Sequence, residues 1–389
     1  MDLSNIYNLS EEKLNQYREN PFPDDEVRPG IKLFAEKLKK DILALHTPYV
    51  LVLEGGYGVG KTYFITRFCE YLKKCRYDSD IPMKSVYLNL WENDYVANPF
   101  PVIVSQIIQQ LNPAKEILDD ITKKAIQVTN NLIKFGAKAF SGINIGDVLP
   151  NPKQDKQDLS DFKHSLQKMI ADTGSKVVLV VDEIDRCRPD YAVKSLETIK
   201  HFFDIDGLFV LLTTKLDFMD SICEAYYGHP KCEINTGEGY IQKFVQSKKI
   251  LNPISQEDYA FIMRGIFDKN SLPVKELGYG QIENINSPEN ARGIEHFIKI
   301  MSQCFYEAGF SVRKTIDICN EIRLLIQQNA KQVWTGMVDN FPELIIIKYL
   351  KEKGILPEKI EEPDVAWNHD DFYNENDELI QNRLKMLMY

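Results

Sequence analysis

The sequence predicts an α/β fold in which a parallel sheet is sandwiched by helices and is followed by a smaller helical domain. Three observations predict it. Short apolar runs alternate with helical patterns over about residues 46–230, which is typical of consecutive βαβ units. A glycine-rich loop separates the first apolar run from the next helix. Beyond Pro253 the apolar residues recur only at helical spacing.

The first half of the fold is expected to contain two strands and three helices. Apolar residues at helical spacing predict the helices, and unbroken apolar runs predict the strands. In chain order these are a helix at 29–45, a strand at 49–53, a helix at 61–74, a strand at 85–90 and a helix from 102 to 111. Residues 112–158 are polar and show no regular pattern, so they are expected to form an inserted polar segment with a mobile edge.

The second half of the sheet begins with a β-branched run at 176–181, which fits a central parallel strand buried on both faces. A helix is expected at 162–170, another at 191–203 and a further strand at 208–212; helices at 256–268, 290–308 and 311–330 follow. These elements predict a core domain at 1–250, a helical lid domain at 251–335 and a helical, acidic tail at 336–389.

The loop between the strand at 49–53 and the helix at 61–74 has the sequence of a complete phosphate-binding loop, or P-loop. Its backbone N–H groups can surround the phosphates of a nucleotide, and its glycines permit the backbone conformations this needs. Lys61 is expected to reach the β- and γ-phosphates, and the Thr62 hydroxyl is expected to coordinate Mg²⁺. The predicted nucleotide-binding residues are Gly55, Gly56, Tyr57, Gly58, Val59, Gly60, Lys61, Thr62 and Tyr63.

An acidic pair, Asp182 and Glu183, directly follows the strand at 176–181. Residues at the carboxyl end of a parallel strand point into the ligand crevice of such a sheet. Asp182 is therefore the expected Mg²⁺ ligand, directly or through water. Glu183 is the expected residue to orient and deprotonate the attacking water, because transfer of the γ-phosphoryl group depends on a positioned acceptor.

Three further polar positions are candidates for the catalytic set. Arg186 either pairs with Asp185 on the surface or points at the nucleotide of a neighbouring subunit. One of Thr213 and Thr214, at the end of the strand at 208–212, is expected to sense the γ-phosphate, and we select Thr214. Arg313 opens a helix of the second domain and either reaches the phosphates on domain closure or is an ordinary solvated charge.

The bulk composition narrows the class of protein. The chain has 389 residues, enough for two packed units, and its net charge of −10 does not indicate nucleic-acid binding, although a local basic groove stays possible. Its seven cysteines show no metal-ligand spacing, and no apolar stretch approaches the ~20 residues of a membrane-spanning helix. We therefore expect reduced thiols, no membrane span and a cytoplasmic location.

The residues 182–187, Asp-Glu-Ile-Asp-Arg-Cys, resemble the Mg²⁺-site signature of the KAP family of P-loop NTPases, the family of the phage-exclusion protein PifA. Residues 87–92, 197–210 and 239–246 are also similar to elements of that family, so the resemblance covers about 25–330. It implies an ATPase of the type that carries an additional strand and a catalytic glutamate. Many members carry membrane helices between the two nucleotide motifs, where this chain has only the polar segment 112–158.

Three functions are considered. The favoured one is a regulatory ATPase that uses ATP and Mg²⁺ to switch a domain or oligomer arrangement, in bacterial antiviral defence or phage exclusion as the resemblance implies. The second is a scaffold that binds ATP with little turnover and recruits an effector protein, with the acidic, aromatic segment 367–373 as a docking candidate. The third, a kinase, predicts a lid with several arginines, which the sequence does not show.

Overall fold

The computed structural model describes residues 11–23, 30–75, 82–141, 152–227, 240–251, 254–267, 288–333 and, between 346 and 358, all residues except 348 and 352. The chain divides into two compact units near residue 252. The loop tip 57–60 groups with the second unit, and the rest of the described chain up to residue 251 forms the first. Each unit is described by itself.

The first unit contains a five-stranded sheet in which all the paired strands are parallel. The strand order is β2-β3-β4-β1-β5. This confirms the predicted parallel sheet. The strand β5 was not predicted, because its sequence Ser-Lys-Lys-Ile alternates between half-buried and exposed residues and carries no apolar run. The strands are β1 (Tyr49–Glu54), β2 (Met83–Asn89), β3 (Lys176–Asp182), β4 (Leu208–Thr214) and β5 (Ser247–Ile250).

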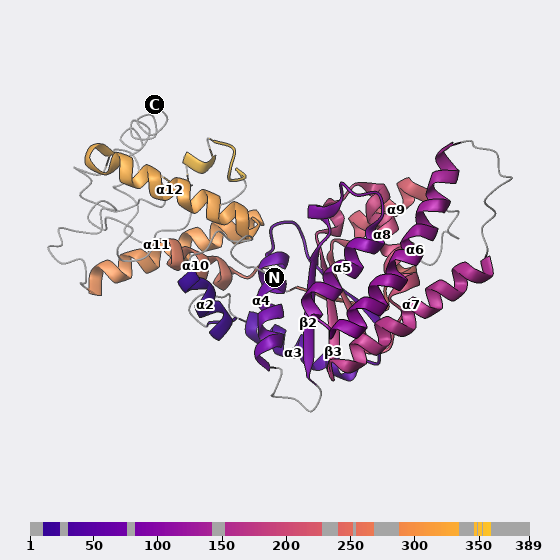
Figure 1. The fold of residues 1–389 in the computed structure, drawn as a ribbon. Coiled ribbons are helices and arrows are strands. Elements are labelled where there is room, and N and C mark those ends of the chain that lie inside the picture. The colour runs from indigo at the N-terminus through magenta and orange to yellow at the C-terminus, as the bar shows by residue number, and fades with distance from the viewer. Residues whose placement is uncertain are drawn as a thin grey trace. The chain divides into compact units, whose positions relative to one another are not determined.

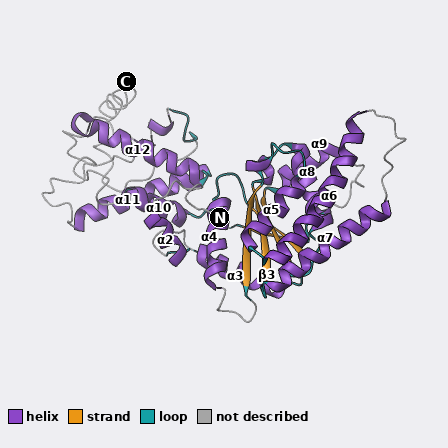
Figure 2. Cartoon of the chain, in the orientation of Figure 1, coloured by secondary structure: helices purple, strands orange, loops and turns teal. Residues whose placement is uncertain are grey.

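Helices cover both faces of this sheet (Figures 1 and 2). In the view of Figure 2, α3 and α4 lie on one side of the strands, and α5 and α8 lie on the other. Burial on both faces explains why β3 is an unbroken β-branched run: Val177, Leu179 and Val181 pack into one core, and Val178 and Val180 are buried on the opposite face.

The helices of this unit are α2 (Glu11–Glu19), α3 (Ile31–Ala44), α4 (Lys61–Lys74), α5 (Pro99–Leu111), α6 (Lys115–Ser141), α7 (Pro152–Asp172), α8 (Pro189–Phe202) and α9 (Leu216–Tyr227). Three short 3₁₀ turns are η2 (Trp91–Asn93), η3 (Ile184–Arg186) and η4 (Tyr240–Lys243).

The segment 112–158 is largely helical, so the prediction of an irregular insertion is wrong for its described residues. The helices α6 and α7 pack against each other. The stripe that holds α6 consists of Ile121, Ala125 and Val128, which recur at helical spacing and are buried. The polar residues between them occupy the outer face of the helix and obscured this sparse periodicity in the sequence. The mobile edge was expected at 150–158, of which residues 152–158 belong to α7. Residues 142–151 lie outside the described residues.

The second unit is helical in its described part, with α10 (Gln256–Ile266), α11 (Pro288–Ala308) and α12 (Val312–Val333). The helix α10 begins with a capping box in which Ser255 and Asp258 each accept a hydrogen bond from the other's backbone N–H. The core of this unit extends past the boundary predicted at 335, because Ile347, Leu350 and Leu356 pack into it. The acidic part of the predicted tail, 359–389, lies outside the described residues.

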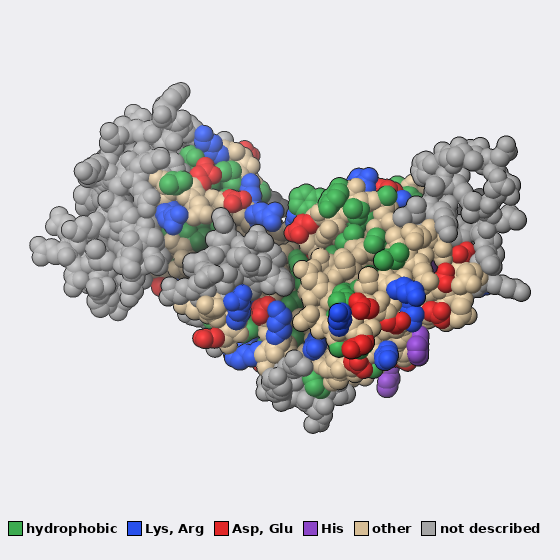
Figure 3. All heavy atoms as spheres, in the orientation of Figure 1, with side chains coloured by type: hydrophobic (Ala, Val, Ile, Leu, Met, Phe, Trp, Pro, Cys, Tyr) green, Lys and Arg blue, Asp and Glu red, His purple; other side chains and the backbone are tan. Residues whose placement is uncertain are grey.

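The composition of the chain also led to expectations about its thiols, membrane spans and surface charge. Six cysteines of the described chain are free and buried. None of the described helices combines the length and apolarity needed to cross a bilayer. On the face of the described chain in Figure 3, basic and acidic side chains are interspersed over the first unit and form no broad basic patch.

Candidate functional site

The loop that joins β1 to α4 has the backbone of a phosphate-binding turn. Gly58 and Gly60 have φ values of 73° and 95°, a conformation that side chains rarely adopt, so glycine is required at both positions. Lys61 is the first residue of α4. The first turn of a helix carries backbone N–H groups without a partner inside the helix, together with the positive end of the helix dipole. The turn can therefore bind an anion.

The Lys61 ammonium folds back onto the carbonyl groups of its own loop. Its Nζ donates hydrogen bonds to the Gly55 oxygen at 2.6 Å and the Gly56 oxygen at 3.2 Å. Burial lowers the pKa of Lys61, and the nearby charges of Asp185 and Asp182 oppose that shift. A nucleotide phosphate would supply the negative charge that favours the protonated ammonium.

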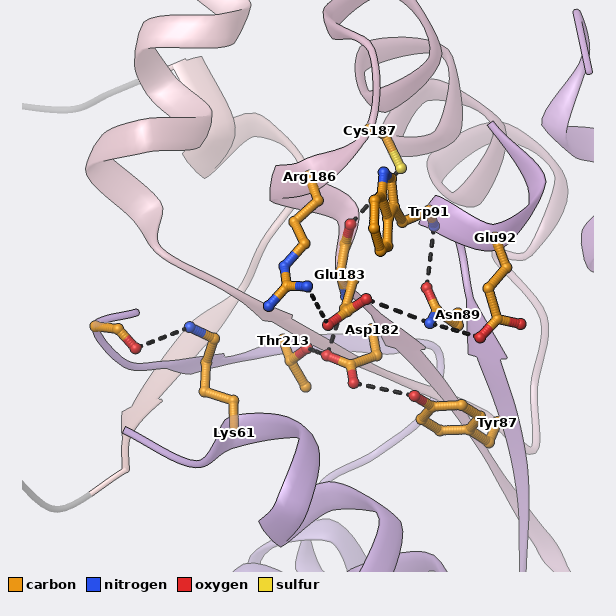
Figure 4. A network of polar contacts seen from close by, with 11 residues as sticks. Lys61, Tyr87, Asn89, Trp91, Glu92, Asp182, Glu183, Arg186, Cys187 and Thr213 are labelled. Carbon is orange, nitrogen blue, oxygen red and sulfur yellow. Dashed lines mark hydrogen bonds and ion pairs between the residues drawn. The ribbon is translucent and has the colours of Figure 1, made fainter. Parts of the chain in front are cut away.

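Asp182 ends β3 and is almost fully buried, with 1% of its surface exposed. Its carboxylate accepts hydrogen bonds from three directions (Figure 4). The Tyr87 hydroxyl of β2 donates to Oδ2 at 3.1 Å, the Thr213 hydroxyl of β4 donates to Oδ1, and the backbone N–H of Glu183 donates to Oδ1 at 3.0 Å. The two strands that flank β3 therefore fix the orientation of this carboxylate.

Glu183 has a left-handed backbone, with φ 59°, which is uncommon for a residue that is not glycine. Its Oε1 pairs with an Arg186 nitrogen at 3.1 Å, and its Oε2 accepts a hydrogen bond from Asn89 Nδ2 at 3.3 Å. Burial is the main cause that raises the pKa of Glu183, followed by the charge of Asp182. Arg186 and Asn89 act in the opposite direction, because both stabilise the ionised form.

Asn89 connects Glu183 to the turn that follows β2. It lies in register with Asp182 on the neighbouring strand. Its Oδ1 accepts a hydrogen bond from the Trp91 backbone at 3.1 Å, and its Nδ2 also donates to Glu92 at 3.0 Å. The Arg186 guanidinium lies 5.6 Å from the centre of a Trp91 ring, which is a cation–π distance. Asn89 at the end of β2, Trp91 in η2 and Arg186 in η3 thus lie around the Glu183 side chain (Figure 4).

The sequence model of the KAP family P-loop domain matches residues 31–302. This chain belongs to the KAP family of P-loop NTPases. The match spans all five strands of the sheet and the whole of the site just described. The predicted family resemblance is thereby confirmed.

Similar proteins outside the family model are distant. An uncharacterised protein of Methanocaldococcus jannaschii is 29% identical over 85 residues, which covers 19% of this chain and 44% of that protein. The chain therefore matches less than half the length of this relative. The solved structure of the Aeropyrum pernix ORC2 protein has a TM-score of 0.37 at 14% identity and covers 96% of this chain and 97% of its own. The C. elegans PCH-2 structure has a TM-score of 0.34 at 11% identity, with 78% and 67% covered.

The residues of the P-loop and the acidic pair suit the binding of a nucleotide together with Mg²⁺. The glycine backbone, the helix start at Lys61 and its ammonium suit phosphate oxygens. Within the described part of the chain, no group of three or more His, Cys, Asp or Glu side chains could form a cation site. A single carboxylate such as Asp182 suits Mg²⁺, which in nucleotide sites takes one or two carboxylates and completes its shell with phosphates and water. Thr62, the second residue of α4, stays the predicted hydroxyl ligand.

The structure brings the predicted Lys61, Asp182, Glu183 and Arg186 together within the first unit. One of the two alternatives for Arg186 is wrong: its carboxylate partner is Glu183, not Asp185. Asp185 is buried and accepts a long hydrogen bond of 3.4 Å from the Lys215 backbone.

The choice of Thr214 as the sensor stays a prediction. Thr213 reaches Asp182, whereas the buried Thr214 hydroxyl has no hydrogen-bond partner among the described residues. Successive side chains of a strand point to opposite faces of the sheet, so Thr213 and Thr214 have different surroundings at the end of β4. Arg313 lies in the first turn of α12 in the second unit, and its role toward the phosphates stays a prediction.

Two contributors from β2 were not predicted as parts of the site. Tyr87 and Asn89 are two residues apart on one strand, so they share a face and contact Asp182 and Glu183 respectively. The sequence did offer a signal: Asn89 is a polar residue at the end of an apolar run, and Tyr87 lies two residues before it, on the same face of a strand. The sequence does not show that β2 lies beside β3, so this signal could not be connected to the acidic pair.

Proposed function

We propose that this KAP protein binds ATP with Mg²⁺, hydrolyses it, and uses the cycle to switch a domain or oligomer arrangement. The observation that carries the proposal is the carboxylate pair Asp182 and Glu183 at the end of β3, held in one unit with the P-loop lysine. A phosphate loop supports binding of any triphosphate. An oriented carboxylate next to an expected Mg²⁺ ligand supports hydrolysis as well.

The residues take distinct roles in this proposal. Lys61 leaves its loop carbonyls and pairs with the β- and γ-phosphates. Asp182 and Thr62 would hold Mg²⁺, which would supply positive charge to offset that of the phosphates. Glu183 accepts a proton from the water that attacks the γ-phosphorus. Thr213 keeps Asp182 oriented.

The contacts of Glu183 supply a reason for regulated turnover. Both carboxylate oxygens are engaged, one by Arg186 and the other by Asn89. A general base needs a lone pair aimed at the water; each oxygen keeps a second lone pair beside its contact, so Arg186 and Asn89 decide where the free lone pairs of Glu183 point. We expect water to compete for the Arg186 contact, because 36% of the Arg186 side chain is exposed. If Arg186 leaves Glu183, its guanidinium can stabilise the negative charge that develops on the phosphates, in this subunit or in a neighbour.

The substitution Glu183→Gln tests the proposal. It keeps the size of the side chain and removes the ionised base. We expect ATP hydrolysis to fall by about two to four orders of magnitude, because general-base catalysis contributes on that scale, while the dissociation constant of ATP with Mg²⁺ stays within a few-fold of wild type. Phosphate release and equilibrium binding are the two measurements. Glu116→Gln, at an exposed position in the first turn of α6, is the matched control.

The same experiment separates the alternative function. A wild-type protein that binds ATP tightly and shows no turnover would support an ATP-binding scaffold that recruits a partner. Turnover that survives Glu183→Gln would contradict the role of Glu183. The setting in phage exclusion rests on the family resemblance alone, so the proposal concerns the nucleotide step.

A further inference from the structure

Tyr87 reaches the acidic pair from the edge of the sheet. The strand β2 is the outermost strand beside β3, and Tyr87 lies in register with Val180 there. Its side chain extends two residues along the neighbouring strand and donates to Oδ2 of Asp182 at 3.1 Å. The residue is buried, with 8% exposed, so this hydroxyl does not exchange freely with water.

The hydrogen bonds of Asp182 leave a single acceptor position that is both vacant and oriented. An ionised carboxylate oxygen has two lone pairs. Oδ1 accepts from the Thr213 hydroxyl and from the Glu183 backbone, so both of its lone pairs are used. Oδ2 accepts from Tyr87 alone among the described donors. The second lone pair of Oδ2 is therefore the position that can face a cation or its water.

The main chain of Tyr87 is also held, although one side of an edge strand has no strand partner. The side-chain amide of Gln110, on α5, supplies what a further strand would supply. Its Oε1 accepts from the Tyr87 N–H at 3.0 Å, and its Nε2 donates to the Tyr87 oxygen at 2.7 Å. Both backbone groups on that side are thereby satisfied, and the origin of the Tyr87 side chain is fixed.

We propose that Tyr87 is a positioning residue for the Mg²⁺ of the nucleotide site, and that Gln110 supports it from α5. This inference rests on the proposed function. Without the phenol hydroxyl, Oδ2 has no donor among the described residues, and the carboxylate can rotate toward the vacated space. Outer partners of metal ligands typically change metal affinity by about 10- to 100-fold when they are removed. Tyr87 thus acts on the metal through Asp182 and does not itself touch the phosphates.

The test is Tyr87→Phe, which removes only the hydroxyl. The measurement is the dissociation constant of ATP over a series of free Mg²⁺ concentrations and in the presence of a chelator. We expect the Mg²⁺ concentration that gives half of the metal-dependent gain in affinity to rise by about 10- to 100-fold. Affinity in the chelator should stay near the wild-type value, and a cooperative melting transition checks that the variant is folded. Gln110→Leu keeps the phenol and should shift the Mg²⁺ series in the same direction by a smaller factor.

Tyr191→Phe is the matched control. Tyr191 is buried in the same unit, and its hydroxyl has no hydrogen-bond partner in the described part of the chain. Its removal should leave the Mg²⁺ series unchanged. A Tyr87→Phe series that superimposes on wild type would overturn the inference, as would an equal loss of affinity with and without Mg²⁺. A wild-type protein that binds no ATP would instead refute the proposed function, and this inference with it.

Discussion

At the scale of single residues, the site depends on how two adjacent carboxylates are held. Asp182 is surrounded by donors from β2 and β4, whereas Glu183 is shared between Asn89 and Arg186. The left-handed backbone of Glu183 separates the two side chains, so that consecutive residues take different roles. Such a conformation is costly for a residue other than glycine and is often found at functional sites.

The pH dependence of hydrolysis follows from the environment of Glu183. A general base is active only when it is deprotonated, and burial raises the pKa of Glu183 above its ordinary 4.5. The rate at saturating ATP should therefore fall on the acidic side, at a pH higher than an ordinary glutamate would give. The variant Asn89→Ala removes a hydrogen bond that stabilises the ionised form, so it should move this acidic limb to still higher pH. A limb that moves to lower pH in Asn89→Ala would contradict this assignment of Glu183.

The residue types that form the site could be predicted from the sequence, but only some of the contacts between them could. Lys61, Asp182 and Glu183 follow from motifs whose chemistry fixes their spacing. The contact of Thr213 with Asp182 depends on β4 lying beside β3 and on the register between the two strands, which no local pattern shows. Arg186 stands next to Asp185 in sequence, but the 3₁₀ turn η3 carries its guanidinium to Glu183, three residues before it. Sequence neighbours are poor guides to partners in so tight a turn.

At the scale of elements, the central strands and α4 could be predicted because burial on both faces imposes continuous apolar runs. The edge strand β5 and the helix α6 could not. Lys248 and Lys249 of β5 pair with Glu54 and Asp41, so its outward side chains are charged and the strand lacks an apolar signature. Lysines on an edge strand also discourage pairing with other chains.

A buried serine joins the two helices of the segment 112–158. Ser165 of α7 donates to Oδ2 of Asp120 at 2.5 Å and accepts from the Lys124 ammonium at 2.6 Å. The hydrogen bond from Ser165 is the first cause that lowers the pKa of Asp120 below its ordinary 3.8, and the one from Lys124 is the second. A carboxyl whose pKa is lowered by folding contributes stability above its unfolded pKa, and this contribution is lost as the pH falls through the folded value.

Ser165→Ala is therefore expected to destabilise the first unit by about 0.5–1.5 kcal/mol at pH 7, the net scale of one hydrogen bond, because Asp120 and Lys124 still reach water and pair with each other. The part of this cost that depends on the charge of Asp120 should shrink as the pH falls below 3.8. Urea unfolding at several pH values measures it, with Ser221→Ala at an exposed position of α9 as the control. If the loss in free energy of unfolding caused by Ser165→Ala stayed constant down to the lowest pH, it would not depend on the charge of Asp120.

At the scale of the whole molecule, two separate cores form the described chain. The sheet and its helices make the first, and α10, α11 and α12 with residues 346–356 make the second. Composition and length predicted two units, and the change from strand to helical patterns predicted their boundary near 250, close to the observed division at 252. The sequence did not indicate that the second core extends beyond 335 to include Ile347, Leu350 and Leu356.

The proposed switch acts at this scale, since ATP can shift an equilibrium between arrangements only through contacts that differ between them. In the proposed cycle, every such difference begins with ATP bound at Lys61.

The most direct test of the central claim is therefore equilibrium binding of ATP with Mg²⁺ to wild type, to Lys61→Ala and to Lys73→Ala. Lys73 lies on the same helix and pairs with Glu70, so it is the matched control. We predict that Lys61→Ala weakens binding at least about 100-fold, the scale of a lost charge-assisted contact to phosphate, while Lys73→Ala binds as wild type does. An ATP dissociation constant in Lys61→Ala equal to that of wild type would contradict the proposed nucleotide site.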